Sequence, residues 1–200
     1  MERLAPDTAL LLIDVQAGFD DPAWGRRNNP DMERRVADLL AAWRAAGLPV
    51  IHVHHDSPDA SGHLRPGTRG NAAKPEARPA PGEPVYRKSV NSAFIGTTLA
   101  DDLRASKVCA LIIVGLTTNH CVSTTARMAA NLGFETFVAA DATAAFDRPA
   151  LDGKIRPAAD VHDAALSDLQ GEFAQIVNSR ALVAALADRW PGKASEGCHA

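Results

Sequence analysis

Runs of apolar residues alternate with amphipathic segments along most of the chain. Thr8–Val15 and Ala110–Val114 are almost continuously apolar, as is typical of strands buried on both faces of a sheet. Asp31–Ala46 instead carries its apolar residues three and four positions apart, the spacing of a helix with one buried face. Gly47 follows directly, where a helix often ends on a glycine. The pattern therefore predicts both strands and helices in one core.

The rest of the chain continues this alternation. Further helices are expected at Leu99–Ser106, His120–Leu132, Val161–Phe173 and Arg180–Trp190, and further strands at Leu48–His54, Glu135–Ala140 and Gln175–Val177. Such an order predicts a Rossmann-like three-layer α/β/α fold with a mostly parallel central sheet. We expect a single domain over residues 1–200, with about residues 191–200 as a flexible tail.

The stretch from Ser57 to Pro84 breaks the pattern because it is rich in proline and glycine. A loop of this length inside a compact domain is usually functional or disordered. Neither flank reads as an independent domain, so we expect this loop to pack over the functional site. In parallel sheets that site lies at the carboxyl ends of the strands, which here means Asp14 and the loops after His54 and Val114.

Composition narrows the classes of partner. The formal net charge is −3, which gives no electrostatic case for binding nucleic acid or an anionic membrane. The apolar runs are too short to span a bilayer, and the first residues lack the apolar stretch of a secretory signal. We therefore expect a cytoplasmic location. The cysteines show neither a CxxC pair nor ligand spacing, which argues against a structural zinc site.

Two residues stand where chemistry would be expected. Asp14 ends a buried strand, where an ionised carboxylate is costly unless something uses or neutralises it. It is a candidate general base, or an acid that braces a loop. Cys121 follows a buried strand at the expected start of a helix, where backbone amides stabilise a thiolate and an oxyanion. It is a candidate nucleophile, the alternative being a small buried apolar residue.

Other polar residues are harder to assign from spacing. Lys88 and its neighbour Arg87 are equally possible as a functional cation, and most such side chains are simply solvated. His52, His54, His55 and His63 form a loose group of candidate metal ligands. They lack a recognised ligand signature, so we expect no metal and no other cofactor.

Three ordered motifs, LLLIDVQAGF, RKSVNSAFIGTTL and VGLTTNHCVSTTARMAANLGFE, resemble those of the isochorismatase-like cysteine hydrolases. That superfamily includes nicotinamidases, N-carbamoylsarcosine amidohydrolase and ureidoacrylate amidohydrolases. The resemblance covers roughly residues 8–180. It implies a catalytic triad of Asp14 as general base, Lys88 as electrostatic partner and Cys121 as nucleophile. It also implies a cis peptide bond between Leu116 and Thr117, with the amides of Thr117 and Cys121 as the oxyanion hole.

The match has two departures that bear on the substrate. The Asp-x-His metal motif of nicotinamidases does not align with HVHHDSPD, which favours the branch acting on ureido or carbamoyl compounds without a metal. Isochorismatases that hydrolyse a vinyl ether need no thiol, so Cys121 favours C–N hydrolysis of a small amide. A vinyl-ether hydrolase, a lactam-opening hydrolase and a non-catalytic binding scaffold remain alternatives.

Contacts with the substrate are expected from side chains close to the triad in sequence. These candidates are Phe19, Trp24, Asn91 and Phe94, and plain core packing is an equal alternative for each aromatic residue. Related enzymes form dimers or tetramers, so the resemblance also implies a homodimer or homotetramer.

Overall fold

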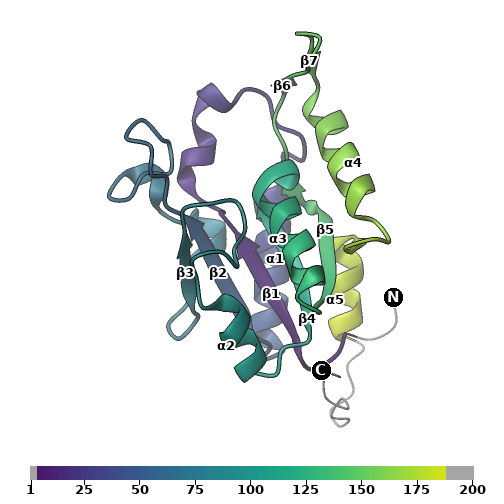
Figure 1. Ribbon diagram of the computed structural model, residues 1–200. Coiled ribbons are helices and arrows are strands. Elements are labelled where there is room, and N and C mark those ends of the chain that lie inside the picture. Colours follow the sequence, from purple (N-terminus) through teal and green to yellow (C-terminus); the bar gives the residue numbers. More distant parts are fainter. Residues whose placement is uncertain (1–3, 188–200) are drawn as a thin grey trace.

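A six-stranded parallel sheet forms the centre of the molecule (Figure 1). The computed structural model describes residues 4–187. In sheet order the strands are β3 (Val85–Lys88), β2 (Val50–His55), β1 (Thr8–Ile13), β4 (Ala110–Leu116), β5 (Glu135–Ala144) and β8 (Gln175–Val177). Strand β1 is buried along its whole length and pairs with β2 on one side and β4 on the other. The predicted single α/β domain with a mostly parallel sheet is confirmed.

Helices cover both faces of the sheet, as Figure 1 shows. Helices α1 (Met32–Ala45) and α5 (Ser179–Ala187) pack on one face, and α2 (Leu99–Ala105), α3 (Ser123–Asn131) and α4 (Ala158–Leu169) pack on the other. Each face has its own apolar cluster. On α1 the predicted stripe is buried, including Leu39 and Trp43, and each such side chain contributes about 1.5–3 kcal/mol.

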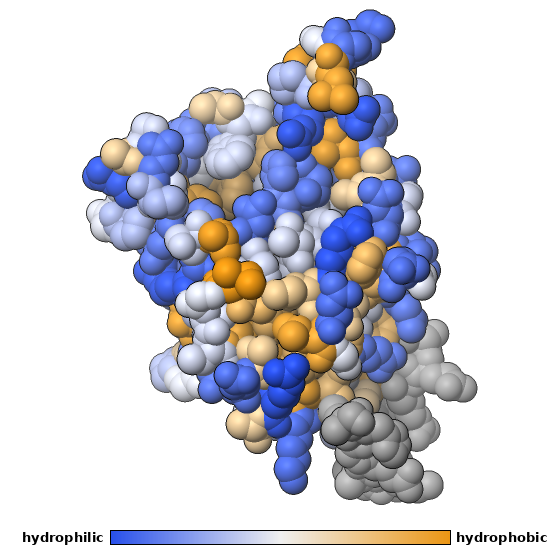
Figure 2. Space-filling model, in the orientation of Figure 1, coloured by the Kyte–Doolittle hydropathy of each residue, from blue (hydrophilic) through white to orange (hydrophobic). Residues whose placement is uncertain are grey.

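The sequence pattern missed two features of the sheet region. Strand β3 is a short edge strand whose residues are mostly exposed, so it carries no apolar run. A two-stranded antiparallel hairpin, β6 (Arg148–Pro149) and β7 (Ile155–Arg156), projects from the body (Figure 1). Its tip carries the exposed side chain of Leu151, and apolar surface is visible there in Figure 2.

Other bounds differ only slightly from the prediction. Helix α3 begins later than expected because Thr118–Val122 forms a π-helical turn. The expected end of the last helix at Trp190, and the tail at residues 191–200, lie outside the described residues. None of the helices in residues 4–187 has the length and apolarity to cross a membrane.

The loop between β2 and β3 packs against α1 and against the end of β2, and its expected place over the functional site stays a prediction. Two 3-10 turns, Arg69–Asn71 and Pro75–Ala77, give it structure. The ammonium of Lys74 is buried and lies 2.6 Å from a carboxylate oxygen of Glu33 on α1. Burial alone raises the pKa of Glu33, but hydrogen bonds from Arg27 and Lys74 outweigh it and lower the pKa to about 2. This loop is therefore anchored through charge pairs as well as through the buried apolar side chains of Leu64 and Ala77.

Candidate active site

Polar side chains lie at the ends of three neighbouring strands, at one edge of the sheet. Asp14 follows β1 directly, His55 is the last residue of β2, and Lys88 is the last residue of β3. Because β2 lies between β1 and β3, and His55 pairs with Lys88 in register, these side chains converge. The chain turns sharply at Asp14, whose φ of 51° lies in the left-handed region.

Asp14 and Lys88 form an ion pair with no exposed side-chain surface on either partner. The Nζ atom of Lys88 lies 2.6 Å from Oδ2 of Asp14. Burial raises the pKa of Asp14, while the charge and hydrogen bond of Lys88 oppose that rise. The other carboxylate oxygen, Oδ1, is buried and has no hydrogen-bond partner. One oxygen of Asp14 is therefore committed to Lys88, and the other is open to a proton donor.

Cys121 supplies that donor from the π-helical turn after β4. Its Sγ atom lies within 4.8 Å of both a carboxylate oxygen of Asp14 and a ring nitrogen of His55, and the thiol is free. Burial, and next the charge of Asp14, raise the pKa of the Cys121 thiol to about 12, and Lys88 opposes them. The sequence predicted a thiolate favoured by the helix amides, and the direction of this pKa shift contradicts the electrostatic part of that prediction.

A protonated resting thiol has a mechanistic consequence. Ionising a group with a pKa of about 12 at pH 7 costs roughly 7 kcal/mol, since each pKa unit is worth about 1.4 kcal/mol. A neighbouring acceptor with a raised pKa lowers this cost because it takes the proton as the sulfur attacks. Asp14 is such an acceptor by its place and by the direction of its pKa shift.

The predicted cis peptide bond between Leu116 and Thr117 is present. The hydroxyl of Thr117 lies 3.1 Å from Nδ1 of His120, and Nη1 of Arg148 lies 2.8 Å from Nε2 of that ring. A guanidinium only donates, so Nε2 accepts and Nδ1 carries the proton that Thr117 accepts. Arg148 therefore supports, through His120, the segment that carries the predicted oxyanion donors.

His52 and His54 lie on one face of β2, and His55 lies on the other. His52 is bonded to Glu83 at 2.8 Å, and His54 contacts Arg87 at 3.4 Å. His63 lies in the following loop and pairs with Asp21 at 3.1 Å. These three histidines do not gather at one point.

Asp14, His55 and Cys121 come close enough together to share a metal ion. The ammonium of Lys88 already contacts two of them, Asp14 at 2.6 Å and His55 at 3.2 Å. The ammonium group of Lys88 is therefore the cation that these side chains contact.

The four predicted substrate contacts have different surroundings. Oδ1 of Asn91 lies 4.0 Å from the sulfur of Cys121, so Asn91 borders the site. Phe94 is buried and stacks on Phe134 at 6.0 Å between ring centroids, which is ordinary core packing. Phe19 and Trp24 pack on each other at 5.0 Å, within an aromatic group on the opposite side of the sheet core from Phe94.

Sequence reasoning missed the residues that support the site. The side chain of Gln16 accepts a hydrogen bond from the His55 amide at 2.8 Å and donates to the His55 carbonyl at 3.0 Å. Asn71 also donates to that carbonyl at 3.0 Å. Each of these contacts joins residues far apart in sequence, so no local pattern signals them.

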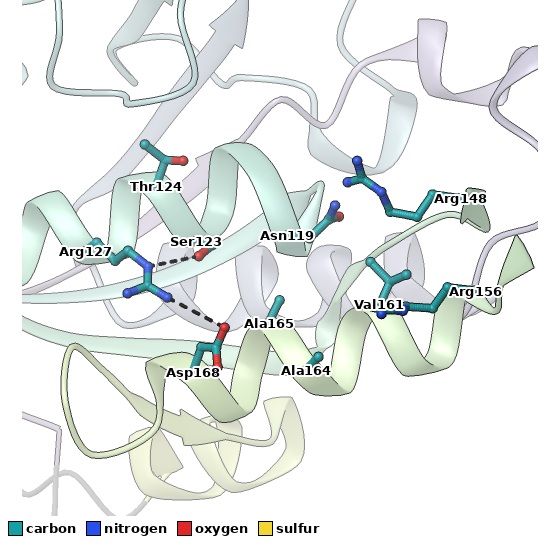
Figure 3. A pocket seen from close by; sticks show the side chains of 10 residues that line it. All are labelled: Asn119, Ser123, Thr124, Arg127, Arg148, Arg156, Val161, Ala164, Ala165 and Asp168. Carbon is teal, nitrogen blue, oxygen red and sulfur yellow. Dashed lines mark hydrogen bonds and ion pairs between the residues drawn. The ribbon is translucent and has the colours of Figure 1, made fainter. Parts of the chain in front are cut away.

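A separate groove of about 510 Å³ lies between α3 and α4 (Figure 3). Asn119, Ser123 and Arg127 line it from one face of the α3 segment. Cys121 is not among the lining residues. Arg127 pairs with Asp168 across the groove, as the dashed lines in Figure 3 show. The groove and the triad are therefore distinct places.

Comparison with known proteins agrees with this geometry. The Isochorismatase domain family matches residues 8–181. The crystal structure of a putative hydrolase of the isochorismatase family from Chromobacterium violaceum is 44% identical, with a TM-score of 0.91 over 94% of this chain and 98% of that one. The uncharacterised isochorismatase family protein YrdC of Bacillus subtilis is 41% identical over 88% of this chain and 94% of its own length.

A relative with a defined activity is also similar. Ureidoacrylate amidohydrolase RutB of Methylorubrum extorquens is 31% identical over 76% of each chain. Fold, family match and relatives agree. The chain belongs to the isochorismatase family of hydrolases.

Proposed function

We propose that this chain is a cysteine hydrolase that cleaves a C–N bond in a small amide, ureido or carbamoyl substrate through a thioester on Cys121. The observation that carries the proposal is the meeting of a free thiol, a buried carboxylate with one unpartnered oxygen, and a buried ammonium at one end of the sheet. The amidohydrolase activity named for RutB supports the same bond type.

The first half of the reaction transfers the acyl group to sulfur. As Sγ of Cys121 attacks the carbonyl carbon, the thiol proton passes to Asp14, whose raised pKa makes it a stronger base than an ordinary carboxylate. The tetrahedral oxyanion receives hydrogen bonds from the amides of Thr117 and Cys121, and one such donor is worth about 3–4 kcal/mol. Asp14 then protonates the leaving nitrogen, the C–N bond breaks, and ammonia or an amine departs.

The second half regenerates the thiol. Asp14, now ionised, takes a proton from water as the water oxygen attacks the thioester carbon. The C–S bond breaks, the acid product leaves, and the proton on Asp14 returns to sulfur. Lys88 stays hydrogen-bonded to Asp14 throughout, so the region around carboxylate, thiolate and ammonium carries no more than one net charge.

A panel of substrates tests the proposal. Small amides, ureides, carbamoyl compounds and lactams are assayed for release of ammonia or amine, together with a vinyl ether related to isochorismate. We expect turnover of at least one C–N substrate, and its loss in Cys121→Ser at unchanged thermal midpoint. Ser123→Ala, two residues along the same segment and facing the groove, is the matched control and keeps the activity.

Other results would favour the other functions. Hydrolysis of the vinyl ether that persists in Cys121→Ser indicates an ether hydrolase. A well-folded protein with no turnover of any compound favours a binding scaffold. Amide hydrolysis that survives in Cys121→Ala contradicts the thioester route.

Three further expectations belong with this proposal. Asn91 lies close enough to the sulfur to contact the substrate, and substrate contacts by Phe19, Trp24 and Phe94, which also pack on other aromatic rings, stay a prediction. The homodimer or homotetramer stays a prediction, as does a location in the cytoplasm.

A further inference from the structure

His55 is held on the side of Lys88 that Asp14 does not occupy. Both backbone polar groups of His55 are bonded to the side chain of Gln16, and Asn71 adds a second hydrogen bond to the carbonyl. A residue fixed in this way at a strand end keeps its ring in one place.

The contacts of the ring settle which nitrogen carries its proton. Nδ1 of His55 lies 3.2 Å from Nζ of Lys88. An ammonium group has donors only, so Nδ1 accepts and carries no proton. The remaining nitrogen, Nε2, then carries the proton of the neutral ring. Burial, and next the charge of Lys88, lower the pKa of His55, in agreement with a neutral ring.

The other charged groups around His55 do not compete for Nδ1. Asp56 is bonded to Arg87 at 3.2 Å and to Asn71 at 2.9 Å. Asp14 is bonded through Oδ2 to Lys88. Lys88 therefore donates two of its three N–H groups, one to Asp14 and one to His55. The third is left for the sulfur of Cys121, which also interacts with this ammonium.

We propose that His55 is a positioning residue that holds the ammonium of Lys88 so that its third N–H points at the sulfur of Cys121. This inference deepens the proposed function and rests on it. Without the ring, the ammonium group of Lys88 is held by Asp14 alone. Its third N–H group then no longer points at the thiolate that forms on Cys121. No net charge changes, because the ring is neutral.

Alkylation of Cys121 by iodoacetamide tests this role without any substrate. The rate is followed from pH 7 to 11 by mass spectrometry of the peptide that contains Cys121. His55→Ala is expected to slow the reaction at least tenfold at pH 8 and to stay slower by the same factor up to pH 11, since tenfold corresponds to one pKa unit of the thiol. His55→Gln, whose amide has one acceptor and one donor group, is expected to stay within about threefold of the wild type.

His54→Ala is the matched control, because His54 is the preceding residue of β2 and contacts Arg87 instead. It is expected to react like the wild type. The proposal is overturned if His55→Ala alkylates at the wild-type rate, or if His55→Gln is as slow as His55→Ala although both are folded by thermal denaturation. Both readouts concern only the thiol, so a failure to find C–N substrates would contradict the proposed function and leave this result intact.

Discussion

Replacing Lys88 by methionine isolates what the buried ion pair does. Methionine has a similar length and no charge, so the carboxylate of Asp14 is left without its cation in a site with no exposed side-chain surface. Removing one member of a buried pair typically costs about 3–5 kcal/mol. For a chain of this size that lowers the thermal midpoint by roughly 6–20 °C.

The loss depends on pH because Asp14 can escape by taking a proton. Its pKa in the folded protein is already raised above the ordinary value of 3.8, and loss of Lys88 raises it further. A group with a raised folded pKa adds stability below its unfolded pKa, and that stability is lost as the pH rises through the folded pKa. Lys88→Met is therefore expected to be closer to the wild type at pH 5 than at pH 8.

The double variant Asp14→Asn, Lys88→Met gives the decisive comparison. It removes both charges, and replacing a whole buried pair is often neutral in stability. We expect it to recover most of the midpoint lost by Lys88→Met while showing no hydrolytic activity. Thermal unfolding of the wild type, both single variants and the double variant is measured at pH 5 and 8. Losses in the single variants that simply add in the double variant would refute the reasoning, as would Lys88→Met as stable as the wild type.

Three other predictions concern the close packing of β4 on β1, the anchoring of the loop between β2 and β3, and the oxyanion segment. Gly115→Ala places a methyl group 2.0 Å from the backbone oxygen of Ile13 in β1, at a φ of +113°. We expect it to lower the free energy of unfolding in urea by about 3 kcal/mol or more. The control Gly153→Ala, also at positive φ but in open space, should lower it by about 1 kcal/mol. Because the pKa of Glu33 is lowered to about 2, its ion pairs stabilise the fold above pH 4.5 by at most about 3 kcal/mol. This stabilisation is lost as the pH falls toward 2. The free energies of unfolding of the wild type and of Glu33→Gln should therefore differ at pH 7 and converge near pH 2. Arg148→Ala removes one of the two donors to Nε2 of His120, the other being the side-chain amide of Asn119, so kcat should fall by up to about tenfold with KM and thermal midpoint little changed; an unchanged kcat would exclude support of the oxyanion segment by Arg148.

The sequence predicted most of the sheet because β1 and β4 are buried on both faces and read as apolar runs. It missed β3 because an edge strand with exposed residues has no such run. The motifs nevertheless placed Lys88 in the site, since the family resemblance does not depend on recognising the strand that carries it.

The direction of the pKa shift of Cys121 could not be predicted from its local sequence. Its position after β4 favours a thiolate through nearby amides, but burial and the charge of Asp14 act in the opposite direction and are larger. Both depend on contacts across the sheet, which one segment of sequence does not contain. The same holds for His55, which the alternation of β2 separates from His52 and His54, and which only the pairing of β2 with β3 brings to Lys88.

The central claim is that Cys121 becomes covalently acylated during turnover. The most direct measurement is the intact mass of the protein, quenched with acid within milliseconds to seconds of mixing with a turned-over amide, followed by peptide mapping. We expect an added mass equal to the acyl group on the peptide with Cys121, which disappears after turnover ends and is absent in Cys121→Ser. Burst release of amine with no adduct at any time, or an adduct on another residue, would contradict it.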